Sequence, residues 1–193
     1  MTIFSILMTV FLGCVLYINM RGQRDLIYVS YADKHSLLTS AIMERINGYL
    51  LSGDSDSVRE YLKKLNKDID GFDCFILNGE GLISISGDAA KEGEHFSTIV
   101  KETAAVKSVQ GLLSGKENGH ISSFESKNKK IYFNTLVPIK NASGCAGCHG
   151  DKKDVLGLAR ISISLAKPYE ILKKINNKLI LTAGIGLIGF IIL

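Results

Sequence analysis

The chain has 193 residues, of which 46% are hydrophobic, and a formal net charge of +4. All 23 basic and 19 acidic residues lie between Arg21 and Lys178, so both ends are uncharged. These figures exclude a disordered chain, a bundle of many membrane spans and a protein that binds nucleic acid through a general basic surplus. They leave a hydrophilic central domain, residues 21–178, between two apolar ends.

The first end, residues 1–20, predicts a transmembrane helix. Its apolar run at 3–20 is roughly 27 Å long as a helix, against a hydrocarbon core of about 30 Å. A cleaved signal peptide would need a basic start and a cleavage site between small residues, and the sequence has neither. We therefore expect an uncleaved anchor.

The second end, residues 179–193, is wholly apolar but spans only roughly 22 Å as a helix. We expect it to be the start of a second transmembrane helix, with the natural protein continuing beyond it. Basic residues flank both apolar ends on the side of the central domain. The positive-inside rule would therefore place that domain in the cytoplasm.

The central domain begins with helical periodicity. Apolar residues recur at three- and four-residue steps from residue 21 to about 52, which predicts a long amphipathic helix that continues from the first span. Gly53 ends it, and Asp54 or Ser55 can cap a second helix at about 56–66.

From residue 72 the spacing of apolar residues changes to the pattern expected of β-strands. Residues 72–77 and 82–86 predict a β-hairpin around Asn78-Gly79, a dipeptide that supplies the positive φ of such turns. Cys74 lies within this apolar hairpin, where we expect a buried structural thiol. A helix is predicted at about 97–113.

A second hairpin is expected from residues 121–125 and 131–139, around a lysine-rich turn at 127–130. A final strand is predicted at 155–165, and Pro168 suits the first turn of a helix that runs into the closing apolar segment. The predicted fold class is α+β, with an antiparallel sheet of about five strands backed by helices.

One motif carries chemistry. Residues 145–149 read Cys-Ala-Gly-Cys-His, the C-x-x-C-H signature of c-type haem attachment. Two thiols three positions apart can form thioethers to the two vinyl groups of one porphyrin, and the adjacent histidine supplies a ligand to the iron. We predict one covalent haem c on Cys145 and Cys148, with His149 as the proximal iron ligand.

Other interpretations of this motif fit less well. A thioredoxin-like pair would need a βαβ context, and a zinc site would need further paired Cys or His ligands; neither is evident. Haem is attached to such motifs outside the cytoplasmic membrane. We therefore expect the protein in the cell inner membrane with its central domain in the periplasm, against the lysine and arginine bias.

The order of these features resembles the periplasmic haem-c sensor domains, PAS-like or Cache-like modules of bacterial methyl-accepting chemotaxis proteins and sensor histidine kinases. The residues that carry the resemblance are the hairpin at 72–86, LVPIKN at 136–141, CAGCHG at 145–150 and VLG at 155–157. The resemblance implies a PAS-type sheet, a homodimer that can exchange its N-terminal helices, and a cytoplasmic output domain for chemotaxis or a histidine kinase.

The sixth iron ligand is less determined by the sequence. The candidates are water, an empty position, or one of the side chains Met20, Met43, His35, His95 and His120. The resemblance implies that the N-terminal helix contributes to the haem pocket, which favours Met43, with His35 as the alternative. A methionine at position 43 also suits a plain core or dimer seam.

We expect a transmembrane receptor, not itself an enzyme, whose haem senses redox state or a small gas such as NO, CO or O₂. Its signal would pass as a displacement of the membrane-linked helices. The alternative is a membrane-anchored monohaem cytochrome that exchanges electrons with a redox partner. The receptor interpretation predicts a signalling module after residue 193.

Overall fold

The computed structural model describes residues 2–127, 130–150 and 154–192. The chain divides into two compact units. The helical unit comprises Met1–Lys34 and Leu165–Leu193, and the sheet unit comprises His35–Ser164.

The helical unit is built from the first part of α1 (Thr2–Leu51) and from α6 (Ala166–Ile192). Pro168 lies in the first turn of α6, as predicted, where its missing N–H has no intrahelical acceptor to lose. Within the described residues, no helix combines the length and the apolar character needed to cross a membrane. Side chains at positions 1–6 and 187–193, which belong to the two predicted spans, lie outside this description.

The sheet unit contains five antiparallel strands in the order β2-β1-β5-β4-β3, which confirms the predicted fold class. The strand that comes last in the sequence pairs with both β1 and β4 and so occupies the centre of the sheet. The strands are β1 (Phe72–Asn78), β2 (Ile83–Ser86), β3 (Ile121–Lys127), β4 (Lys130–Lys140) and β5 (Val155–Ser164).

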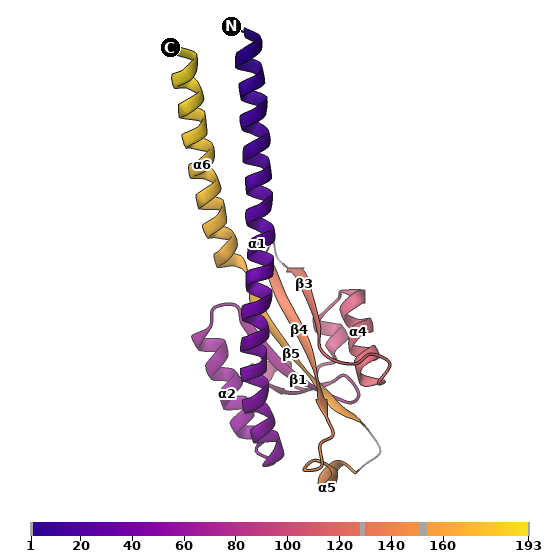
Figure 1. Ribbon diagram of the computed structural model, residues 1–193. Coiled ribbons are helices and arrows are strands. Elements are labelled where there is room, and N and C mark those ends of the chain that lie inside the picture. The colour runs from indigo at the N-terminus through magenta and orange to yellow at the C-terminus, as the bar shows by residue number, and fades with distance from the viewer. Residues whose placement is uncertain (1, 128–129, 151–153, 193) are drawn as a thin grey trace. The chain divides into compact units, whose positions relative to one another are not determined.

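One face of the sheet packs against the second part of α1 and against α2 (Ser55–Asp68) (Figure 1). Asp54 caps α2 as predicted, because its carboxylate accepts a hydrogen bond from the Ser57 N–H at 3.0 Å. The core of this face includes Ile42, Met43, Ile46, Val58, Leu62, Cys74, Ile76, Ala159 and Ile161. Cys74 is fully buried, as predicted, and burial raises the pKa of its thiol.

The opposite face packs against α3 (Phe96–Ile99) and α4 (Thr103–Leu113) (Figure 1). The prediction of a single helix at 97–113 is therefore wrong. Val100 leaves the helix with an extended backbone (φ −111°), and its N–H donates to the Phe96 carbonyl. Phe96, the first residue of α3, and Val100, directly after its last, are both buried in the core, at 1% and 3% exposed.

The first hairpin also differs in detail from its prediction. The positive φ of the turn falls on Gly81 (82°) and not on Gly79. The Asn78 side chain organises the loop instead, because its Oδ1 accepts hydrogen bonds from the backbone N–H groups of Glu80 and Leu82 at 2.9 and 3.0 Å. A short 3₁₀ helix, η1 (Ala89–Lys91), follows β2. In the second hairpin, turn residues 128–129 lie outside the described residues.

Candidate functional site

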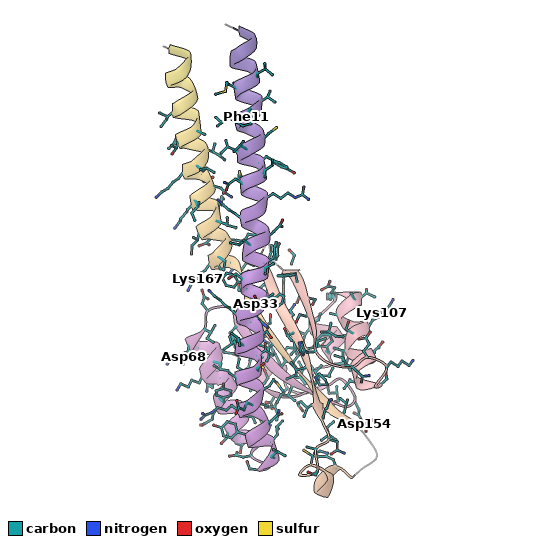
Figure 2. The ribbon with its side chains drawn as sticks, in the orientation of Figure 1. Phe11, Asp33, Asp68, Lys107, Asp154 and Lys167 are labelled. Atoms are coloured by element: carbon teal, nitrogen blue, oxygen red, sulfur yellow. The ribbon has the colours of Figure 1, made fainter. Side chains whose placement is uncertain are left out.

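The C-x-x-C-H motif lies in the connection between β4 and β5, which are adjacent strands in the middle of the sheet. Hydrogen bonds tie the two ends of this connection together. The Asn141 backbone N–H donates at 2.9 Å to the carbonyl of Asp154, which directly precedes β5 and is labelled in Figure 2. The Asn141 side-chain Nδ2 donates to the Gly150 carbonyl at 2.6 Å. The motif is therefore held as a closed loop at one end of the sheet. Residues 151–153 lie outside the description.

Within this loop, α5 (Ala146–His149) forms one turn of helix. The Cys145 N–H donates to the Ala142 carbonyl at 2.8 Å, and the His149 N–H donates to the Cys145 carbonyl at 3.0 Å. The turn thus begins directly after Cys145 and ends at His149, and this backbone hydrogen bond joins the two residues. Cys145 is a half-buried free thiol and His149 is exposed, whereas the Cys148 side chain lies outside the description.

The loop packs beside the end of α1. A Cβ atom added at Gly144 would lie 3.1 Å from Cδ2 of Leu51, the last residue of that helix. Added Cβ atoms at Gly147 and Gly150 would meet no described atom within 4 Å. The loop therefore lies close to the end of α1 at Gly144.

Met43, the predicted sixth ligand, is 7% exposed and belongs to the core between α1 and the sheet. Val137 and Ile139 of β4, the strand that leads into the loop, pack against the same core. Among the described residues, Met43 packs only within this core and is not seen in contact with His149. Whether Met43 binds iron therefore stays a prediction.

His35, the alternative ligand, is also buried, at 5% exposed, and so is not a solvated helix residue. Its Nδ1 lies 3.1 Å from the Thr39 hydroxyl and 3.2 Å from the Thr135 hydroxyl, and its ring meets Phe133 edge-on at 4.6 Å. Its Nε2 has no hydrogen-bond partner among the described residues. Thr135 precedes Asn141 by six strand positions, or roughly 20 Å. His35 therefore lies well away from the C-x-x-C-H loop.

The other candidate ligands to the iron, His95, His120 and Met20, lie in environments unlike those of Met43 and His35. His95 is exposed and caps α3, with its Nδ1 lying 2.8 Å from the Ser97 hydroxyl. His120 is exposed ahead of β3, and Met20 is half-buried in the helical unit. Among the side chains that the structure describes, no three His, Cys, Asp or Glu residues are grouped to hold a metal ion.

Sequence reasoning missed a charged cluster on the α4 face of the sheet. Arg160, 7% exposed, donates from Nη2 to Glu125 Oε2 at 2.7 Å and to Asn134 Oδ1 at 2.9 Å. Asp73 accepts from Lys91 at 2.7 Å. One signal was available, because Asp73 and Arg160 are charged residues inside otherwise apolar strand patterns.

The family model described as the sensor of a methyl-accepting chemotaxis sensory transducer, class 40H, matches residues 40–166. The chain belongs to this family. The match includes all five strands of the class 40H sensor and the complete C-x-x-C-H loop. The domain is thus the sensory region of a signal-transduction receptor.

Two solved structures are similar to this class 40H sensor. The sensor region of a sensor histidine kinase is 14% identical, with a TM-score of 0.39 over 50% of this chain, which spans only 40% of that one. A domain of an HTR-like protein from Haloarcula marismortui ATCC 43049 is 16% identical, with a TM-score of 0.36 over 50% of this chain and 100% of that chain. No curated protein matches the sequence significantly.

The buried His35 predicts a pH dependence of stability. Burial lowers its pKa from 6.5 to about 4 in the folded chain. Between these values only the unfolded chain takes up the proton, so the free energy of unfolding falls as pH drops through this window. The total loss should be roughly 2–3 kcal/mol. Urea unfolding at about pH 7 and about pH 4.5 measures it.

The control is His35→Gln, which removes the titrating group while other ionisable groups stay the same. Its free energy of unfolding should fall less over the same interval. An equal fall in the variant and the wild type would contradict the assignment to His35.

Proposed function

We propose that this sensor carries one covalent haem c on Cys145 and Cys148, with His149 as the proximal iron ligand. The observation that carries the proposal is the closed loop, in which Cys145 directly precedes a single helical turn that ends at His149 and is joined to His149 by a backbone hydrogen bond. The Cys145 thiol is free, and a Cβ atom added at Gly147 or Gly150 would meet no described atom within 4 Å. These features fit covalent attachment. Haem held by these residues would supply a one-electron couple, and a small gas such as NO, CO or O₂ would compete with the sixth ligand for the iron.

For the sixth ligand we propose Met43. It lies on the segment of α1 whose last residue packs against Gly144 of the loop, and it shares a core with Val137 and Ile139 of β4. Its unbranched thioether can change rotamer without leaving an apolar environment. His35 is less well placed, because it lies beside the middle of β4, away from the C-x-x-C-H loop.

We further propose that the apolar ends, residues 1–20 and 179–193, anchor the sensor in the cell inner membrane with its sheet unit in the periplasm. Large apolar side chains between residues 7 and 18 are exposed, Phe11 (Figure 2) at 64%. Uncovered apolar surface of this kind suits a lipid environment. Because α1 extends from these residues to Leu51 beside the loop, a change in iron ligation would reach the membrane through one continuous helix. The functional unit would be a homodimer, with N-terminal helices that can be exchanged between subunits.

Single substitutions of the motif cysteines test the attachment. In cells that mature c-type cytochromes, Cys145→Ala and Cys148→Ala should each lose most of the haem that stays with the chain on a denaturing gel. Cys74→Ala is the matched control, because that thiol is buried in the core and should leave chain-bound haem at the wild-type level. Wild-type amounts of chain-bound haem in both motif variants would refute the proposal.

Met43→Leu tests the sixth ligand while it conserves core volume. Loss of the thioether should change the absorption spectrum of the reduced protein and lower its reduction potential, since a methionine ligand raises the potential of haem iron. Spectroelectrochemistry of this variant beside His35→Gln separates the two candidates. If only His35→Gln changes the spectrum, or neither does, the Met43 assignment is wrong.

A further inference from the structure

Basic residues gather in the helical unit where the two apolar ends meet the rest of the chain. We call them the basic cluster: Arg21, Arg24, Lys173, Lys174 and Lys178. The segments that hold them, residues 21–24 and 173–178, contain no acidic residue, and the nearest ones are Asp25 and Glu170. The positive charge of these segments is therefore not balanced within them.

The two halves of the basic cluster lie at the same height. The first part of α1 and α6 belong to one unit, and the rings of Tyr28 and Tyr169 meet edge-on in it at 6.1 Å. The helices run antiparallel, with the start of α1 and the end of α6 at the same end (Figure 1). Counted from the tyrosine contact at 1.5 Å per residue, Arg21 is level with position 176, and positions 173–178 all lie within roughly 5 Å of it.

The side chains of the basic cluster that the structure describes face solvent. Arg21, Lys173, Lys174 and Lys178 are exposed, and none of the ion pairs among described residues includes them. Lys174 and Lys178 are four positions apart and so lie on one helical face, where two like charges destabilise a helix. An anion from outside the chain would offset this repulsion.

Other polar groups lie in the same layer. Gln23 donates from Nε2 to Asn19 Oδ1 at 2.8 Å, and the amide oxygens of Gln23 and Asn176 are both buried. Positions 173–178 span roughly 8 Å along the helix, which matches the about 5–8 Å of polar headgroups on each side of a bilayer core. The basic cluster thus has the depth of one headgroup layer and borders the apolar ends directly.

From this arrangement we propose that the basic cluster binds the headgroups of anionic phospholipids in the periplasmic leaflet. The proposal rests on the membrane anchoring proposed above. The lysine ammonium groups and the Arg21 guanidinium donate to phosphate oxygens, and the guanidinium can donate two parallel hydrogen bonds to one phosphate. A zwitterionic headgroup brings its own cation, so only a lipid with net negative charge is attracted.

Lipid binding of this kind would act on both helices that the receptor moves. The basic cluster takes cations from α1 and from α6, so bound anionic lipid holds the two helices at one depth in the membrane. A displacement of either helix would have to break contacts with the headgroups. The lipid therefore sets the resting position against which a signal from the sheet unit works.

Spin-labelled lipids test the proposal on the full chain reconstituted into phosphatidylcholine vesicles. The relative association constant of spin-labelled phosphatidylglycerol should be roughly threefold or more above that of spin-labelled phosphatidylcholine, and the preference should fall in about 1 M salt. A chain that resists alkaline extraction but shows no preference would overturn this proposal and leave the anchoring intact. A chain that alkaline extraction removes from the vesicles would refute the anchoring and the lipid proposal together.

Variants with matched charge locate the contact. Lys173→Gln, Lys174→Gln and Lys178→Gln together should bring the two association constants close to equal, since glutamine keeps the helix propensity and removes the charge. The control is Lys63→Gln, Lys64→Gln and Lys67→Gln, which removes three exposed charges from α2 with nearly the same spacing and should keep the wild-type preference.

Arg21→Gln provides a second test that leaves α6 unchanged, and it should lower the preference in part. Wild-type preference in both the α6 variant and Arg21→Gln would refute the proposal. An equal loss in the α2 control would also refute it, because the preference would then follow the net charge of the chain.

Discussion

The sheet unit depends on the central position of β5. β5 is the last strand in the sequence but lies in the centre of the sheet, where it pairs with β1 over seven residues and with β4 over nine. Alternate residues of one strand therefore supply both cores, Ala159 and Ile161 to the α1 layer and Leu158 to the α4 layer. Neither layer can form until residues far apart in the sequence have met, which makes the fold strongly dependent on long-range pairing.

The same constraint positions the candidate haem site. Because β4 and β5 are antiparallel neighbours, the fourteen residues between Lys140 and Val155 must leave and return at the same end of the sheet. A connection of this length is long for a hairpin, and long connections often carry function. Asn141 closes it by bonding both Gly150 and Asp154, so its ends are fixed while the motif extends beyond the sheet.

Alternation along β5 also separates the core that contains Met43 from the charged cluster around Arg160. Ile161 faces that core, whereas Arg160 lies with Phe75 on the other side. Burying Arg160 is costly, and its pairing with Glu125 offsets that cost, so removal of either partner would leave an uncompensated charge. A change on either face can thus alter the strand that both faces share.

Local signals predicted much of this fold. The alternation of apolar and polar residues predicted the five strands, and Asp54 predicted the N-terminal cap of α2. The five residues of the C-x-x-C-H motif predicted the candidate haem loop. Other features depend on contacts that no local pattern encodes. The break at Val100 has no proline or glycine to mark it in the sequence between α3 and α4. The burial of His35 requires Thr135, one hundred positions away, and the Arg160 cluster requires Glu125 from an edge strand.

The most direct test of the account is the mass of the intact, unfolded full chain after expression in cells that mature c-type cytochromes. Covalent attachment through Cys145 and Cys148 predicts a single major species heavier than the polypeptide by one haem. A chain with the mass of the bare polypeptide, from cells shown to mature another c-type cytochrome, would contradict the central claim that this chemotaxis sensor is a haem protein.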